Sequence, residues 1–336
     1  MRIGIIGAGL MGSTHAAAWL VTGSDIVGVS AQPLEEAEGL SQQYGAKVYS
    51  SLDVMIPDVD VVDICTPTHL HYEMVLKAAR ARKHIVCEKP LARSVVQGQE
   101  MVRFCHEMGV KLMLAHVVRF FPEYVQAKKA VQDGLVGDVA VVRLGRKSFQ
   151  PKKAHDNWYV DFEKSGGIMM DLMIHDFDYA RWVAGDVDSV FAKSISHSSL
   201  NATIDHGLVI LTHKSGAISH IEGSWAYPPS MFVTDFEIAG TEGLLTHHSA
   251  ESSPLAVYLK DKGQLKSADV AVPASPLSED PYTTEIKAFH NYILHDAPIP
   301  VQAGDGLAAL QIAEAAIESA KSGKPIQLDS LIEVAL

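Results

Sequence analysis

A glycine pattern close to the first residue limits most strongly what this chain can fold into. The apolar run Arg2–Ile6 leads directly into the residues GAGLMG at positions 7–12, which match G-x-G-x-x-G, and a helical pattern follows. In such a motif the first glycine permits a tight turn, the second lets the backbone approach a pyrophosphate, and the third allows a strand and a helix to pack closely. The N-terminus of the helix offers free N–H groups to the phosphates. The motif therefore predicts a bound dinucleotide, with contacts from Gly7, Gly9, Leu10, Met11 and Gly12.

Short apolar runs and helical patterns alternate along the first third of the chain. The runs are expected strands at Arg2–Ile6, Asp25–Ser30, Val59–Cys65, His84–Glu88 and Lys111–Ala115. The segments between them include expected helices at Met11–Leu20, Leu34–Tyr44 and His71–Ala81. Alternating strands and helices form βαβ units around a parallel sheet that is covered on both faces. We therefore expect residues 1–118 to form a doubly wound α/β domain of the Rossmann type.

Beyond residue 118 the pattern changes to helices and grouped strands. Helices are expected at Glu123–Gln132, Ile168–Val183, Thr283–Leu294 and Gly306–Lys321. Glycine-containing turns predict two hairpins, which join Leu208–His213 to Ala217–Trp225 and Phe232–Ala239 to Leu244–His247. Strands grouped after βα units indicate a separate α+β domain over residues 119–336, with a large, mainly antiparallel open sheet. Residues 250–277 carry no interpretable pattern.

The composition excludes several classes of function. The 336 residues include 28 Lys and Arg against 40 Asp and Glu, which gives a formal net charge of −12. A surface of that sign repels phosphate backbones and anionic lipids, so neither nucleic acid nor a membrane is expected as a partner. No apolar run is long enough to span a bilayer. The three cysteines are an odd number without zinc-type spacing, which indicates free thiols in a reducing cytoplasm.

The adenosine end of the dinucleotide is less clearly specified. An Asp or Glu for the ribose usually stands about 20 residues beyond the glycines, at the end of the second strand. Here residues 26–29 lead into Ser30-Ala31-Gln32-Pro33, without a carboxylate for a 2′-hydroxyl and without a cation for a 2′-phosphate. Ser30 and Gln32 can hydrogen-bond to either ribose. NAD and NADP therefore both remain open.

Two groups of polar residues are candidates for chemistry. Lys89 follows an expected strand at the sheet edge where open α/β folds bind ligands, and a cation there would stabilise a developing alkoxide. Asp171 and His175 lie four residues apart in an apolar expected helix, so the carboxylate can orient the imidazole and favour its charged form. A histidine with a pKa near neutrality is suited to accept a hydroxyl proton. Asp178 continues the same stripe and is expected to pair with Arg181.

Three further segments complete a recognisable set. They are Thr66-Pro67-Thr68-His69-Leu70-His71, then Glu88-Lys89-Pro90, then Gly166-Gly167 followed by Asp171, His175 and Asp178. With the glycine motif they resemble the family of glucose–fructose oxidoreductase, inositol dehydrogenase and rhizopine-catabolism proteins (Gfo/Idh/MocA), and the resemblance covers nearly the whole chain. Two positions depart from the family pattern, because Ile168 replaces a usual glycine and the ribose carboxylate is missing.

The resemblance implies an NAD(P)-dependent dehydrogenase that moves hydride between nicotinamide and a secondary alcohol of a polyol or sugar, with inositol-like substrates favoured. It implies that Lys89 reaches the nicotinamide ribose and the substrate hydroxyl, that His175 is the general base and that Asp171 orients it. The loops after the third and fourth major strands are implied to lie beside the cofactor, through Thr66, Pro67, His71, Glu88 and Lys89. The implied substrate contacts are Lys89, Arg119, His155, Asn157, Trp158, Asp171, His175 and Tyr282.

Two alternatives of other classes remain open. One is a glycosidase of the same fold that oxidises its sugar transiently, and the other is a cofactor-binding sensor without turnover. The alternation of His69, His71 and Glu73 is metal-like, but the pattern that follows is helical, and we predict no metal. As in relatives, a second subunit is expected to cover one face of the C-terminal sheet, which gives a homodimer or homotetramer. The particular sugar and the direction of the reaction are not specified.

Overall fold

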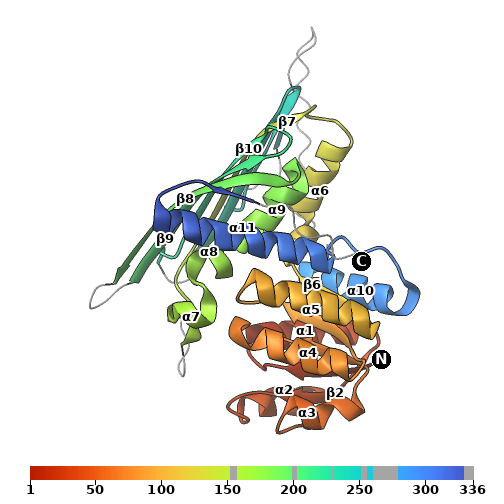
Figure 1. Ribbon diagram of the computed structural model, residues 1–336. Coiled ribbons are helices and arrows are strands. Elements are labelled where there is room, and N and C mark those ends of the chain that lie inside the picture. Colours follow the sequence, from red (N-terminus) through yellow and green to blue (C-terminus); the bar gives the residue numbers. More distant parts are fainter. Residues whose placement is uncertain (152–156, 199–202, 229–230, 251–255, 260–278, 329–336) are drawn as a thin grey trace.

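The computed structural model describes residues 1–151, 157–198, 203–228, 231–250, 256–259 and 279–328. Two lobes are visible, each built around one sheet (Figure 1). The first lobe is a helix-covered parallel sheet, and the second is a longer sheet with helices along one face. Among the described helices, none is long and apolar enough to cross a bilayer.

The first lobe is the predicted doubly wound domain. Its parallel sheet has the order β3-β2-β1-β4-β5-β6. The strands are β1 (Arg2–Ile6), β2 (Asp25–Ser30), β3 (Lys47–Val48), β4 (Val61–Ile64), β5 (His84–Glu88) and β6 (Leu112–Ala115). The helices are α1 (Leu10–Val21), α2 (Glu36–Tyr44), α3 (Leu52–Met55), α4 (His71–Arg80) and α5 (Val95–Met108). The strand order reverses between β1 and β4, so a ligand crevice is expected at the carboxyl ends of these strands.

The glycine motif forms the turn between β1 and α1. Gly7 has a φ of +99°, and a Cβ at this position would lie 2.4 Å from the carbonyl oxygen of Cys65. A Cβ on Gly12 would lie 1.9 Å from the carbonyl oxygen of Gly7. Both positions therefore require glycine, because the turn packs directly against the backbone that leaves β4.

The second lobe contains the predicted open sheet, with the order β13-β12-β11-β7-β10-β9-β8-β14. Its strands are β7 (Val139–Ser148), β8 (Val187–Ser198), β9 (Thr203–His213), β10 (Ile218–Ser224), β11 (Phe232–Gly240), β12 (Gly243–His248), β13 (Ala256–Leu259) and β14 (Ile326–Gln327). Only β7 and β10 pair in parallel among these neighbours, and the other pairings are antiparallel. Both predicted hairpins, β9–β10 and β11–β12, are confirmed.

The helices of the second lobe are α6 (Pro122–Gln132), α7 (Phe162–Ser165), α8 (Gly167–Asp171), α9 (Ile174–Ala184), α10 (Pro281–His295) and α11 (Ala303–Ser322). Helices α8, α9 and α11 pack on one face of the sheet (Figure 1). The prediction of a single helix over 168–183 is wrong, because the chain turns at Leu172 and Met173. There the amide of Met173 donates to the carbonyl of Ile168, five residues back, and the regular helical ladder is interrupted.

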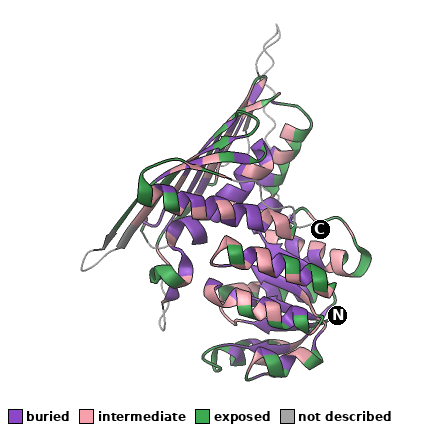
Figure 2. Ribbon diagram, in the orientation of Figure 1, coloured by how far each residue is buried: buried purple, intermediate pink, exposed green. Residues whose placement is uncertain are grey.

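The two lobes are joined by more than the linking chain. Helix α10 packs against α1, and its residues Ile286 and Phe289 share a hydrophobic core with Ile3 and Trp19 of the first lobe. Helix α11 contacts α5. Buried residues are accordingly concentrated in the parallel sheet and along α11, whereas the outer turns of α2 and α3 are exposed (Figure 2). A division at residue 118 thus separates the two sheets, but α10, which follows that division in the sequence, packs on the first lobe.

Candidate active site

A cavity of about 360 Å³ opens between the lobes at the carboxyl ends of the parallel strands. From the first lobe it is lined by Gly9, Leu10, Met11, Cys65, Thr66, Pro67, Glu88 and Lys89. From the later part of the chain it is lined by Arg146, Trp158, Tyr159, Asp171, His175, Phe232, Thr234 and Tyr282, among others. A second cavity of about 450 Å³ extends over the glycine turn and shares five residues with the first, namely Gly9, Cys65, Thr66, Pro67 and Trp158. Together they form one elongated cleft.

The residues around the glycine turn fit a pyrophosphate. Helix α1 begins behind Gly9, which supplies no side-chain cap, so the first amides of the helix are available to a ligand. Gly9, Leu10 and Met11 line the first cavity, and Gly7 lines the second. The absence of any Cβ at Gly7 and Gly12 lets this turn close against the backbone of Cys65 and against its own carbonyl at Gly7. A dinucleotide held here would extend into both cavities.

The second cavity holds the predicted ribose contacts together with charges that the sequence reasoning missed. Ser30 and Gln32 line it as predicted. Three carboxylates also line it, Glu36 on α2, Asp53 on α3 and Glu73 on α4. The cation that lines it, Lys77, has its Nζ 2.9 Å from an Asp53 oxygen. These carboxylates come from three separate helices, so no local sequence motif predicts that they lie together.

His71 does not line either cavity. Its side chain is fully buried, with Nδ1 2.8 Å from the carbonyl oxygen of Pro90 and Nε2 2.9 Å from that of Thr66. Burial lowers the pKa of His71, against the opposing effect of these two carbonyls. The imidazole therefore connects the loop after β4 to the loop after β5, and it positions cofactor-lining residues without lining the cleft. His69, two residues earlier, lines the second cavity.

Lys89 is held by Asp171 across the lobe boundary. Its Nζ donates to the main-chain carbonyl of Asp171 at 2.7 Å and lies 3.3 Å from the carboxylate oxygen Oδ1. The backbone N–H of Lys89 donates to the Glu88 carboxylate at 3.0 Å. The ammonium group is thus fixed at the meeting point of both lobes, inside the first cavity.

The expected pairing of Asp171 with His175 is not seen. Because the helix breaks after α8, residues 171 and 175 do not stand one turn apart on a continuous face, and the Asp171 carboxylate lies beside Lys89 instead. His175 lines the cavity, and its Nδ1 is buried without a hydrogen-bond partner among the described residues. Burial, followed by the nearby charges of Lys89 and Arg146, lowers the pKa of His175 well below its ordinary value. The expectation of a favoured imidazolium is therefore wrong, and the neutral imidazole is the stable form.

Arg119 is engaged inside the protein and does not line the cavity. Its Nε and Nη2 donate to the Asp178 carboxylate at 2.7 and 2.6 Å, and Nη1 lies 3.2 Å from Asp305. Arg181 pairs instead with Asp186 and Asp305. The predicted pair of Asp178 and Arg181 is thus wrong, because Asp178 faces the short 3-10 turn Val117–Phe120 (η3) that carries Arg119.

Of the remaining predicted substrate contacts, some line the cleft and others do not. Trp158, in the 3-10 turn Trp158–Val160 (η4), lines both cavities and stacks on Tyr159 with ring centroids 4.0 Å apart. Tyr282, on α10, lines the first cavity, and burial raises the pKa of its hydroxyl to about 12. Asn157 precedes Trp158 but does not line either cavity. His155 lies outside the described residues.

Arg146 and Thr234 line the first cavity and were not predicted. Arg146, on β7, is buried and donates to the Asp176 carboxylate through Nε and Nη2 at 2.8 and 2.9 Å. Thr234 lies on the neighbouring strand β11, opposite Arg146 in the register. Nothing local marks these positions, since only the folded sheet brings them to the cleft.

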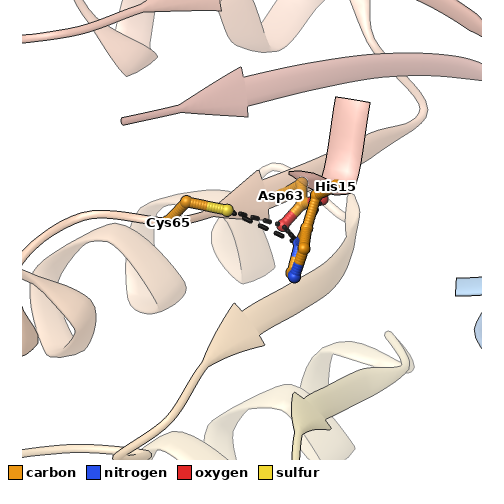
Figure 3. A group of neighbouring side chains, drawn as sticks. All are labelled: His15, Asp63 and Cys65. Atoms are coloured by element: carbon orange, nitrogen blue, oxygen red, sulfur yellow. Dashed lines mark hydrogen bonds and ion pairs between the residues drawn. The ribbon is translucent and has the colours of Figure 1, made fainter. Parts of the chain in front are cut away.

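His15, Asp63 and Cys65 form a cluster at the wall of the cleft, in which His15 and Asp63 are buried and Cys65 lines both cavities (Figure 3). The His15 Nδ1 lies 3.0 and 3.1 Å from the two Asp63 oxygens, and the Cys65 thiol lies 3.4 Å from one of them. The indole of Trp19 donates to the same carboxylate at 2.7 Å.

These side chains are close enough to hold a metal ion, but the Asp63 carboxylate already accepts hydrogen bonds from His15, Trp19 and Cys65. Burial alone would lower the pKa of His15, whereas Asp63 and Cys65 raise it well above its ordinary value. Burial raises the pKa of the Cys65 thiol. The cluster is thus an imidazolium–carboxylate pair beside a neutral thiol, with His15 Nε2 3.3 Å from a Glu88 carboxylate oxygen.

A Rossmann lobe with a phosphate-binding turn, opening onto a cavity with a fixed lysine and a neutral histidine, defines an oxidoreductase that uses a nicotinamide dinucleotide. The chain belongs to the Gfo/Idh/MocA family. Residues 1–116 match the family described as "Oxidoreductase family, NAD-binding Rossmann fold", and residues 124–246 match the "GFO/IDH/MocA C-terminal domain".

Relatives of known name cover nearly the full chain. An inositol 2-dehydrogenase from Rhizobium meliloti (strain 1021) is 30% identical over 351 residues, which cover 98% of this chain and 99% of the relative. The crystal structure of GenD2 from gentamicin A biosynthesis in complex with NAD is 25% identical with a TM-score of 0.86, covering 98% and 97% of the two chains. A levoglucosan dehydrogenase in complex with NADH and L-sorbose shares the fold, with a TM-score of 0.88 at 23% identity over 98% of this chain and 99% of that chain.

Proposed function

We propose that this protein transfers hydride between NAD and a secondary alcohol of a polyol or sugar. The observation that carries the proposal is the presence of the Lys89 ammonium and a neutral His175 in the cavity that also receives the N-terminus of α1. A dinucleotide seated on that turn therefore has a cation and a base beside it. Inositol-like substrates are favoured by the relatives named inositol 2-dehydrogenase and myo-inositol 2-dehydrogenase.

The proposed roles follow from the geometry. The Lys89 ammonium, held by the Asp171 carbonyl, stabilises negative charge on the substrate oxygen. The neutral His175 accepts the hydroxyl proton through Nε2, the nitrogen that is not buried away from the cavity. A nicotinamide ring bound beside them would supply the hydride acceptor in oxidation and the donor in reduction. Asp171 acts on Lys89, which replaces the orienting role on His175 that the sequence suggested.

The walls of the cavity suit a sugar. Trp158 offers an apolar ring to one face of the substrate, while Arg146, Thr234 and Tyr282 offer polar groups for its hydroxyls. The pairing of Arg146 with Asp176 compensates its charge, so this wall does not demand an anionic substrate. A polyol with several hydroxyls in different directions satisfies this arrangement.

The charge of the ribose pocket favours NAD over NADP. Glu36, Asp53 and Glu73 line the pocket, and the ammonium of Lys77 is engaged with Asp53. A 2′-phosphate would meet an excess of negative charge there, whereas a 2′-hydroxyl can hydrogen-bond to Ser30 or Gln32. The relative GenD2 was solved with NAD, in agreement with this preference.

The open face of the second sheet is proposed to pair with another copy of the chain, giving a homodimer or homotetramer. The helices α8, α9 and α11 cover the opposite face (Figure 1). Leu208 on β9 and Ile218 on β10 are exposed apolar side chains of this sheet.

The test is absorbance at the nicotinamide band with purified protein, NAD or NADP in parallel, and a panel of inositols and aldoses. We expect reduction of NAD with an inositol-like polyol and a much weaker signal with NADP. Release of phenol from an aryl glycoside without net reduction of the nicotinamide would favour the glycosidase instead. Tight cofactor binding with no turnover of any substrate would favour a sensor.

The pH dependence of kcat for alcohol oxidation should reflect the protonation of His175, which must be neutral to act as the base. Burial and the neighbouring cations lower its pKa well below the ordinary value of 6.5, so the base stays unprotonated as pH falls through 6.5. We therefore expect kcat to be flat across neutral pH and to fall only below 6.5. Initial rates at saturating substrate in overlapping buffers measure this profile, and an acid limb above pH 6.5 contradicts the assignment.

A further inference from the structure

Arg93 lies in the loop between β5 and α5, four residues beyond Lys89, and its side chain reaches the second lobe. Its Nε donates to the main-chain carbonyl of Glu163 at 2.9 Å, and its Nη2 donates to that of Phe162 at 3.0 Å. Both acceptors belong to α7, a helix of four residues. Because the guanidinium is a rigid, planar fork, two such bonds fix the orientation of α7 as well as its distance from the first lobe. Arg93 itself lines neither cavity.

Helix α7 and the turn η4 are joined into one hydrogen-bonded unit. The hydroxyl of the fully buried Ser165 donates to the carbonyl of Tyr159 at 3.1 Å and lies 3.0 Å from that of Asp161. The amide of Asp161 donates to the carbonyl of Trp158 at 3.2 Å, and the indole of Trp158 stacks on Tyr159. The position of α7 therefore determines the position of Trp158, a residue that lines both cavities.

The other end of this segment is tied to the first lobe by Lys89. Helix α8 follows α7 and ends at Asp171, whose carbonyl accepts the hydrogen bond from Lys89. The Nη1 of Arg93 also contacts the sulfur of Met170 on α8. Two cations of one loop, Lys89 and Arg93, thus hold main-chain carbonyls at both ends of residues 162–171. In the proposed function Lys89 also serves the substrate oxygen, whereas Arg93 lies outside both cavities.

Contacts besides those of Arg93 keep the two lobes together. Helix α7 packs against the 3-10 turn Thr68–Leu70 (η2) of the first lobe, whose residues line the cleft. Helices α10 and α11 contribute the further contacts with α1 and α5. Removing the guanidinium should therefore leave the fold intact and loosen α7 and η4, because both of its main-chain hydrogen bonds end on α7.

We propose that Arg93 is a positioning residue for the polyol and the dinucleotide, and that it acts by holding Trp158 against the cleft through α7. The inference rests on the proposed function, in which the indole of Trp158 forms one wall of the sugar site. Because Trp158 lines both cavities, a loosened indole weakens the binding of both ligands. The bond between Lys89 and Asp171 does not pass through Arg93, so the chemical step keeps its cation.

Arg93→Met tests the proposal, because methionine keeps an unbranched apolar stem and removes the guanidinium. We expect the KM for the polyol and the Kd for NADH to rise on the order of tenfold, the usual effect of losing hydrogen bonds from a charged group. The kcat at saturating ligands should stay near the wild-type value. In Arg93→Lys one ammonium can still reach one of the two carbonyls, so both constants should lie between those of the wild type and the methionine variant. Unchanged KM and Kd values, whatever the kcat, would overturn the proposal.

Lys128→Met is the matched control. Lys128, on α6, also donates to a main-chain carbonyl, that of Trp182, at 2.5 Å, and its ammonium lies 5.5 Å from the centre of the Trp182 ring. This contact stays within the second lobe, and neither residue lines a cavity. Its loss is expected to lower the midpoint of thermal unfolding without changing KM or Kd. An equal rise of both constants in this variant would mean that the loss of any such cation has the same effect, and would overturn the proposal.

A double-mutant cycle without substrate separates this inference from the proposed function. The Kd for NADH is measured by the fluorescence of the bound cofactor in the wild type, Arg93→Met, Trp158→Ala and the double variant. If Arg93 acts through Trp158, its replacement should weaken NADH binding in the wild type and have little further effect once the indole is absent. That result without turnover of any polyol would support the action of Arg93 on Trp158 and contradict the proposed function. An equal loss of affinity from Arg93→Met in both backgrounds would overturn the inference, whatever the activity.

Discussion

Replacing Lys89 with methionine is expected to lower kcat for alcohol oxidation by about two to three orders of magnitude, the usual cost of removing one preorganised donor to a developing oxyanion. The methionine keeps most of the volume of the side chain and removes only the ammonium. NAD binding should be retained in large part, because the amides of α1 and the lining of the second cavity are unchanged.

The measurement is kcat with the preferred polyol, together with the Kd for NAD by fluorescence titration. Lys83→Met is the control, because Lys83 also donates its Nζ to a backbone carbonyl, that of Val59, at 2.8 Å and does not line either cavity. Its kcat should match the wild type. A Lys89→Met enzyme with near wild-type turnover would remove Lys89 from the mechanism.

Replacing Asp178 with alanine is expected to reduce the free energy of unfolding by about 3–5 kcal/mol, because it leaves the Arg119 guanidinium buried without its main partner. Arg119 is only 2% exposed, and both of its bonds to Asp178 are short. Asp305 lies 3.2 Å from a different nitrogen and cannot replace the bidentate contact.

Urea unfolding followed by circular dichroism measures this loss. Asp186→Ala is the control. The Asp186 side chain is more than half exposed, and an exposed ion pair such as the one it forms with Arg181 contributes at most about 1 kcal/mol to the free energy of unfolding. Removing both charges with Arg119→Met and Asp178→Leu should be far less destabilising than Asp178→Ala alone. Equal losses in the single and double variants would show that the cost lies in packing and not in an unpaired charge.

The parts of the fold that could be predicted are those with local causes. The glycine turn, the alternation of strands and helices, and the two hairpins each depend on residues adjacent in the chain, and the structure confirms them. The break between α8 and α9 has no such signal. Leu172 and Met173 are apolar residues in an apolar run, and only the packing of the second lobe interrupts the helix there.

The site residues show the same division. Lys89 and His175 were found from motifs, but the partners of Asp171, Asp178 and Arg119 were not, because each partner comes from a distant segment. Arg146 and Thr234 carry no sequence signal, because only the pairing of β7 with β11 brings them together in the cavity.

The hydrogen bond from Lys89 to the main chain of Asp171 has an evolutionary consequence. The lysine that we propose to act in catalysis lies in one lobe and its anchor in the other, so on this proposal neither lobe transplanted alone would carry the complete site. A recombinant that takes its second lobe from a relative must keep the hydrogen bond between Lys89 and residue 171 before it can act on a different sugar. Selection on chemistry and selection on interdomain geometry therefore act on the same few atoms.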